Sequence, residues 1–265
     1  MPKLNALVAG STGYIGVQLI KILVKHKFVN IKFLCGNSSV GKNISSYDKS
    51  LSGKKLPKII KFNKKLLKDV DVVFTALPNG EAQDISKHLT KNITLIGWSL
   101  GVLETLDYVS RYGTHGLQSL VLIDNSIGEG TPPVAQKKSA AIHTTEQFTQ
   151  YTKNFIAAIF HQPIPAELQQ MIEYSTLRLA HKPAQAFAIL KKPYPREYYR
   201  ETIYASQIPV WYAVTPRYTE QATLFNHKYP LGQSKIYEKN AGHALFIDQA
   251  EDFNRDLENF LQALN

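Results

Sequence analysis

Cysteine is almost missing from this sequence, in which Cys35 is the single example among 265 residues. One thiol cannot form an internal disulfide, so an apolar core has to stabilise the fold. The lack of a disulfide framework is typical of a reducing compartment, and we expect a cytoplasmic location. The chain also shows no secretory leader and no apolar run of roughly eighteen residues, so we expect no membrane partner.

Arginine is absent from residues 1–91, which hold 16 lysines against 5 acidic residues. Residues 92–265 hold 15 basic and 16 acidic residues, so the net charge of +10 comes entirely from the first part of the chain. We favour solvated surfaces over a nucleic-acid partner, because the lysines are scattered and no aromatic residues alternate with them. The abrupt change near residue 90 suggests that the two parts have different origins.

A glycine-rich turn follows the first predicted strand. The strand Leu4–Ala9 runs into GSTGYIG at residues 10–16 and then into an amphipathic helix at residues 17–25. Glycines at this spacing permit a tight turn that brings a pyrophosphate close to a helix N-terminus. The turn predicts dinucleotide-binding residues at Gly10, Thr12, Gly13 and Gly16.

The second predicted strand, Ile31–Cys35, lacks the terminal acidic residue that would bind the ribose 2′-hydroxyl of NAD. Ser38, Ser39 and Lys42 follow it instead and suit a 2′-phosphate, so any cofactor is expected to be NADP. Further strands are expected at residues 58–62 and 71–77.

Three segments in this region carry a family resemblance: AGSTGYIG, GNSSVGK and DVVFTALPNGEA. In this order and spacing they closely resemble the NADP-binding half of N-acetyl-γ-glutamyl-phosphate reductase, over residues 1 to about 90. The resemblance implies a Rossmann-like half, but the catalytic cysteine of that family is missing, since Cys35 lies on the second strand. We therefore expect no reductase activity and a weak or vestigial NADP site, because the domain that would cover the nicotinamide is absent.

Residues 92–101 read NITLIGWSLG, which places G-x-S-x-G between a β-branched strand and a helix-like segment at residues 102–112. A serine in this setting is typical of a nucleophile elbow, in which glycines permit the sharp turn. A chance match in a loop is the alternative. The strand before the motif and the helix after it favour Ser99 as the nucleophile.

From about residue 90 the chain resembles the C-terminal half of an α/β-hydrolase. The resemblance rests on the serine motif, on strands LVLID at residues 120–124 and PVWYAV at 209–214, and on NAGHALF at 240–246. It implies that His243 is the general base, a role suited to a neutral imidazole near pH 7.

The acid of the triad has two candidates. Most members of the superfamily place it after the strand at residues 209–214, where Tyr218 stands near the expected position, followed by Glu220. A minority place it after the preceding strand, where Asp124 lies. We prefer Asp124, and the order serine, acid, histidine agrees with the fold.

The two resemblances predict one α/β fold with a doubly wound, mainly parallel sheet in the order 3-2-1-4-5-6-7-8. We expect a Rossmann-like half at residues 1–90, a hydrolase half at 91–136 and 206–265, and a helical lid at 137–205. Such a sheet would bring the turn after residues 71–77 beside the elbow. The oxyanion donors would then be the N–H of Leu100 and that of Asn79 or Gly80.

These features predict a serine hydrolase that cleaves small carboxylic esters through an acyl-enzyme on Ser99. No cofactor is required for this reaction, and the histidine spacing predicts no metal site. The alternative is an NADP-binding protein without reductase activity whose hydrolase half is inactive. The missing N-terminal half of the hydrolase suggests a fusion, natural or engineered.

Overall fold

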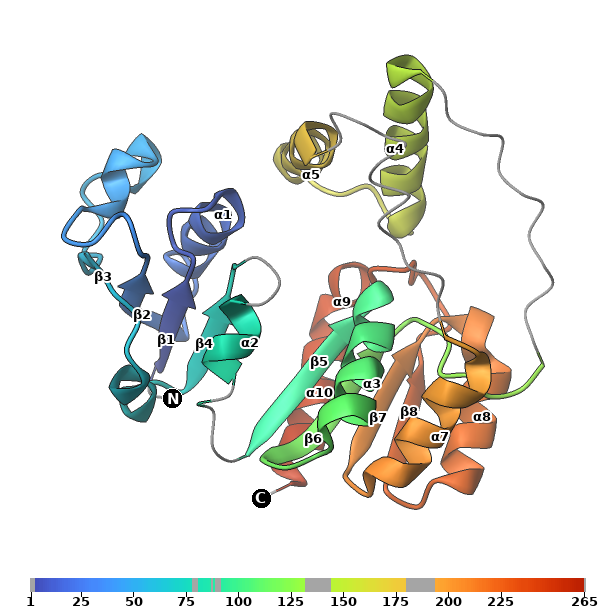
Figure 1. The fold of residues 1–265 in the computed structure, drawn as a ribbon. Coiled ribbons are helices and arrows are strands. Elements are labelled where there is room, and N and C mark those ends of the chain that lie inside the picture. Colours follow the sequence, from blue (N-terminus) through green and yellow to red (C-terminus); the bar gives the residue numbers. More distant parts are fainter. Residues whose placement is uncertain are drawn as a thin grey trace. The chain divides into compact units, whose positions relative to one another are not determined.

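The computed structural model describes residues 3–77, 81–86, 88, 92–131, 144–179 and 194–264. The chain divides into two compact units, Met1–Thr90 and Lys91–Asn265. Each unit has its own parallel four-stranded sheet with helices packed on it (Figure 1), as expected for the α/β class. No helix in the described ranges is both long and apolar enough to span a bilayer.

The first unit is a parallel sheet in the order β3-β2-β1-β4. Its strands are β1 (Leu4–Ala9), β2 (Val29–Cys35), β3 (Ile59–Ile60) and β4 (Val72–Thr75). Its helices are α1 (Tyr14–Leu23) and α2 (Glu81–Ser86), with 3₁₀ turns η1 (Ile44–Ser46), η2 (Lys49–Leu51) and η3 (Lys64–Asp69).

The central strand β1 is buried on both faces, which explains its continuous apolar run. On one face Val8 packs with Val17 and Ile20 of α1. On the other face Leu7 belongs to a cluster that includes Ile85 of α2. The first unit therefore has one apolar cluster on each face of its sheet, and β1 contributes to both.

The second unit is a parallel sheet in the order β5-β6-β7-β8. Its strands are β5 (Ile93–Trp98), β6 (Leu117–Ile123), β7 (Val210–Val214) and β8 (Gly232–Ile236). Its helices are α3 (Leu100–Tyr112), α4 (Thr145–Ile159), α5 (Ala166–Leu179), α7 (Arg196–Ser206), α8 (Thr219–Lys228), α9 (Leu245–Asp248) and α10 (Ala250–Gln262), with the 3₁₀ turn η4 (Pro216–Tyr218).

Alternate residues of β6 and β7 supply two cores on opposite faces of this sheet. Leu120, Leu122 and Tyr212 pack against α3, α7 and α8, whereas Val121 and Trp211 pack against α10. Figure 1 shows α3 and α10 on opposite sides of these strands. The helix α7 thus belongs to the core, although its residues lie at the end of the range expected for a lid. Of that range, residues 137–143 and 180–193 lie outside the described part of the chain.

The order of strands within each half is as predicted, β3-β2-β1-β4 in the first unit and β5-β6-β7-β8 in the second. The expectation that these strands form one eight-stranded sheet is not confirmed, since the structure describes one four-stranded sheet in each unit. Each half already covers both faces of its own sheet with helices. An apolar pattern specifies which face of a strand is buried, but it does not specify which neighbour completes the backbone ladder of an edge strand.

Candidate active site

Ser99 occupies the sharp turn between β5 and α3. Its φ of 56° and ψ of −123° lie outside the regions that residues with a side chain normally adopt. Gly97 is needed for this turn, since an added methyl group would lie 2.6 Å from Thr105 Oγ1. At Gly101 an added methyl group would meet nothing within 4 Å, so only the first glycine of the motif is sterically required. The backbone strain is therefore concentrated on the serine.

His243 lies in the loop between β8 and α9, and its Nδ1 is 2.7 Å from Oδ2 of Asp124. Asp124 directly follows β6, is 3% exposed and has a positive φ of 48°. Its other oxygen accepts hydrogen bonds from Thr215 N, at 2.8 Å, and Thr215 Oγ1, at 2.7 Å. Both carboxylate oxygens are thus partnered, and the direction in which the carboxylate faces the imidazole is fixed.

Trp98 connects the histidine loop to the elbow. Its indole N–H donates to the carbonyl oxygen of His243 at 2.8 Å, and its ring centroid lies 5.3 Å from that of the imidazole. Because Trp98 immediately precedes Ser99, the histidine is held beside the serine turn. In residues 92–131 and 194–264, no hydrogen bond joins Ser99 Oγ to His243. Hydrogen bonds of this kind are often loose without substrate.

Glu220, the other candidate acid, has different partners. Its carboxylate accepts from Thr131 N at 3.2 Å and from Thr131 Oγ1 at 3.0 Å. Tyr218 ends η4, and burial raises the pKa of its hydroxyl, with the charge of Asp124 contributing. Of the two acids, the structure therefore brings Asp124, and not Glu220, to His243.

The predicted oxyanion donors are only partly described. Leu100 is the first residue of α3, where backbone N–H groups lack acceptors within the helix. Asn79 and Gly80 lie outside the described residues.

Several residues that support the elbow were not identified from the sequence. Asn125 donates from its side-chain amide to the carbonyl of Ser99 at 2.8 Å, and so ties the elbow to the loop of Asp124. Trp98 and Thr215 have the contacts given above. Trp98 and Asn125 are sequence neighbours of Ser99 and Asp124, and this proximity could have indicated that they belong to the site. Nothing in the sequence indicated a role for Thr215.

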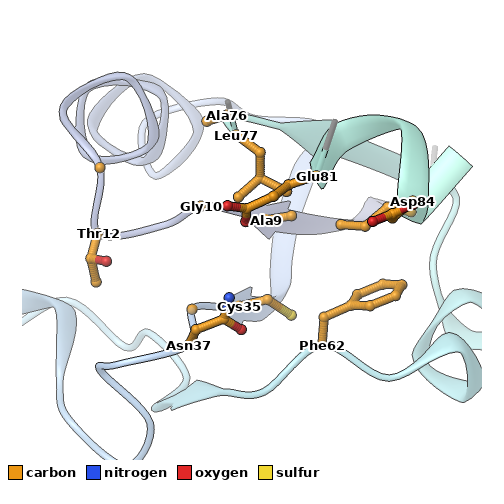
Figure 2. Close-up of a pocket in the computed structure, with 13 residues that line it drawn as sticks. Ala9, Gly10, Thr12, Cys35, Asn37, Phe62, Ala76, Leu77, Glu81 and Asp84 are labelled. Carbon is orange, nitrogen blue, oxygen red and sulfur yellow. The ribbon is translucent and has the colours of Figure 1, made fainter. Parts of the chain in front are cut away.

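The first unit has a separate cavity of about 480 Å³ at the carboxyl ends of β1, β2 and β4. Figure 2 shows Cys35 and Phe62 on one side of it, with Leu77, Glu81 and Asp84 on the other. Burial raises the pKa of the Cys35 thiol to about 11, so this thiol stays protonated near neutral pH. A reactive thiolate is therefore not available in this cavity.

The glycine turn beside the cavity is closely packed against its surroundings. Gly10 has a φ of 75°, and an added methyl group there would lie 3.0 Å from Leu77 Cδ2. A methyl group on Gly16 would lie 3.0 Å from Ser11 Cα, so close helix packing also requires a glycine. Gly13 and Thr12 line the cavity. These residues fit the phosphate-binding half of a dinucleotide.

The loop expected to hold a 2′-phosphate fits less well. Ser38 and Lys42 are exposed, but Ser39 is 1% exposed and its hydroxyl lies 3.4 Å from Thr12 Oγ1. The side chain of Ser39 therefore contacts the glycine turn through Thr12 and is not free to meet a phosphate. Glu81 and Asp84 add negative charge to the cavity wall, which is unfavourable for a phosphate.

Comparison of the sequence with known proteins finds similarity in the N-terminal part of the chain. Residues 5–99 match the family model described as semialdehyde dehydrogenase, NAD binding domain. The N-acetyl-gamma-glutamyl-phosphate reductase of Ehrlichia ruminantium (strain Gardel) is 32% identical over 123 residues, which is 45% of this chain and 35% of that protein. The reductase of Brachyspira hyodysenteriae is 39% identical over 109 residues, covering 40% and 31%. The chain thus spans about a third of the length of these curated relatives.

Solved structures of esterases share the fold. An esterase from Rhodococcus sp. matches 99% of this chain and 92% of its own, with a TM-score of 0.53 and 13% identity. An esterase from Exiguobacterium antarcticum matches 69% and 71%, with a TM-score of 0.50 and 18% identity. The resemblance to a reductase half is confirmed, and the likeness to the esterase structures is one of fold. The family match continues to residue 99 and includes β5, so it extends past the change in composition near residue 90.

Proposed function

We propose that the second unit is a serine hydrolase that cleaves small carboxylic esters through an acyl-enzyme on Ser99. The observation that carries the proposal is the 2.7 Å contact between Asp124 Oδ2 and His243 Nδ1 in a loop bonded to the residue before Ser99. The contact fixes the imidazole with Nδ1 protonated, which leaves Nε2 free to accept a proton.

In this reaction Nε2 of His243 takes the proton of Ser99 Oγ while Oγ attacks the ester carbonyl carbon. The tetrahedral oxyanion is stabilised by the N–H of Leu100 at the positive end of α3. The carbon–oxygen bond to the leaving alcohol then breaks, and His243 returns the proton to that alcohol. A water molecule, deprotonated by His243 in the same way, releases the acid and restores Ser99.

A chromogenic short-chain ester and a fluorophosphonate test this proposal together. We expect turnover of the ester by the whole chain and stoichiometric labelling of Ser99, which peptide mass spectrometry identifies. Labelling at another serine, or undiminished turnover in the Ser99→Ala variant, would contradict the assignment. The same ester assay, with and without NADP, tests whether hydrolysis proceeds without a cofactor.

The second candidate function is binding of NADP by the first unit, with an inactive hydrolase unit. The glycine turn and the cavity of about 480 Å³ favour it, while the buried Ser39 and the carboxylates of Glu81 and Asp84 limit it. We propose that NADP binds weakly and that the chain is a fusion of a reductase half with a hydrolase. Fluorescence titration with NADPH should give a dissociation constant above the micromolar range, and a submicromolar value would show an intact site.

A further inference from the structure

Asp248 joins two segments that are far apart in the sequence. It is the last residue of α9, and its Oδ2 accepts from the backbone N–H of Gly242 at 2.7 Å and of His161 at 2.9 Å. Its Oδ1 lies 3.3 Å from the N–H of Gln162. Gly242 precedes His243 in the histidine loop, whereas His161 and Gln162 follow α4. One half-buried carboxylate therefore binds both segments through charge-assisted hydrogen bonds.

The same two segments touch at two more points. On the other side of His243, Ala244 N donates to the carbonyl of Ile159, the last residue of α4, at 2.9 Å. A methyl group added to Gly242 would lie 2.7 Å from His161 N and 2.9 Å from the carbonyl carbon of Phe160. The chain leaving α4 thus runs directly along the histidine loop, and only a glycine allows this approach.

We propose that Asp248 is a positioning residue that fastens the His243 loop to the end of α4, so that the general base is aligned only while the α4–α5 segment is seated. This inference rests on the proposed hydrolase function. Asp124 and Trp98 bond to the imidazole and to the carbonyl of His243, and among the described residues neither side chain has a hydrogen bond to Gly242 or Ala244. Gly242 is instead bonded to Asp248, and Ala244 is bonded to Ile159 at the end of α4. The distance of His243 from Ser99 therefore depends on the helical segment.

Two variants break this junction by different means. Asp248→Asn keeps the shape of the side chain but removes its charge and one acceptor oxygen. Gly242→Ala keeps the carboxylate and inserts a methyl group between the two backbones. Asp252→Asn is the matched control, because Asp252 is an exposed residue of α10 that pairs with Arg255.

We expect both variants to lower kcat for ester hydrolysis by about tenfold to a hundredfold, since a small displacement of a reacting group has effects of this size. KM should change less than kcat, and the control should keep the wild-type kcat. Each kcat is calculated from the concentration of reactive serine, which is determined by titration to completion with fluorophosphonate. A smaller amount of folded protein therefore does not lower the calculated kcat. If Asp248→Asn fails to fold, Gly242→Ala decides the outcome. Wild-type kcat in both folded variants, or in Gly242→Ala alone when Asp248→Asn does not fold, would overturn the proposal.

Amide hydrogen exchange tests the junction independently of catalysis. Exchange at Gly242, His161 and Gln162 should accelerate together in Asp248→Asn and remain unchanged in Asp252→Asn. In Gly242→Ala the His161 and Gln162 amides should accelerate. Unchanged exchange at His161 and Gln162 would show that Asp248 does not fasten α4. If the wild type is neither active nor labelled at Ser99 while these amides respond as expected, the hydrolase proposal fails and the junction stands as a structural contact.

Discussion

The two units use the same local design, a parallel strand that turns sharply into a helix, but they place the unusual backbone angle on different residues. After β1 the residue with positive φ is Gly10, and after β5 it is Ser99. Glycine adopts such angles without strain and leaves space at the strand ends, where the first unit has its cavity. A serine there bears strain and projects its hydroxyl. The residue that adopts the positive φ thus decides whether the turn leaves space at the strand ends or projects a hydroxyl.

The largest expected effect comes from removing the serine side chain. Ser99→Ala should lower kcat for a short-chain ester by about 10⁶-fold, since catalysis by a triad needs its nucleophile.

Ser99→Gly should remove the activity equally and also raise the free energy of unfolding by about 1 kcal/mol, because glycine relieves the strained angles. Urea denaturation measures the second effect. Gln207→Gly is the matched control, since Gln207 has the milder left-handed angles of 53° and 31°, and a gain at Gln207 as large as at Ser99 would refute stored strain.

The next largest effect is expected at Asp124, whose carboxylate contacts His243. Asp124→Asn should lower kcat by about 10⁴-fold, because the amide no longer stabilises the protonated imidazole. Glu220→Gln should leave kcat near the wild-type value, since Glu220 bonds to Thr131. Steady-state kinetics of both variants with the same ester provide the measurement. A damaging Glu220→Gln beside a mild Asp124→Asn would reverse the assignment of the acid.

Substitution of Gly10 tests the turn after β1 in the first unit. Gly10→Ala should lower the free energy of unfolding by about 1–3 kcal/mol, from strain and from contact with the chain after β4. It should also weaken NADPH binding while ester hydrolysis stays unchanged. Gly41→Ala separates the two causes, because Gly41 has a φ of 84° but its added methyl group meets nothing within 4 Å. Equal losses in the two variants, measured by urea denaturation, would show that close contact at Gly10 is unimportant.

The last test concerns the buried carboxylate of Glu129 in the second unit, whose loss should affect stability and not catalysis. Glu129 is 1% exposed, lies 2.8 Å from Lys228 Nζ and accepts from the Tyr204 hydroxyl at 2.7 Å. Burial raises the pKa of its carboxyl, but the hydrogen bonds from Lys228 and Tyr204 outweigh burial and lower it overall. Its stabilising contribution is therefore complete above its ordinary pKa of 4.5 and is lost as the pH falls through the lowered value.

Glu129→Gln should lower the free energy of unfolding by about 1–3 kcal/mol at pH 7, because the charged partners lose their acceptor. The loss should shrink as the pH falls below the ordinary pKa. Urea denaturation as a function of pH measures this dependence, and Asp252→Asn should give almost no change because its pair is exposed. A loss that stays constant down to the lowest pH would contradict the role of the charge.

Much of the local structure was predictable from the sequence, because it depends on residues that are neighbours in the chain. The apolar runs identified β1, β2 and β5–β7, and the glycines marked both turns. The strand order within each half and the resemblance to a reductase half were also correct, and the resemblance to an α/β-hydrolase was correct as regards the fold. In each of these cases the restricted backbone angles of glycine and the burial of alternate or continuous apolar residues give a local signal.

Tertiary structure decided the features that join distant residues. The sequence left Asp124 and Glu220 as alternatives for the acid, and only packing of the loop after β6 brings Asp124 to His243, 119 residues away. It predicted one eight-stranded sheet, whereas the structure describes one four-stranded sheet in each unit. It proposed Ser39 as a phosphate ligand, but packing buries that side chain. The junction at Asp248 had no signal, because its partners are backbone N–H groups that any sequence supplies, and only the fold determines which of them meet a carboxylate.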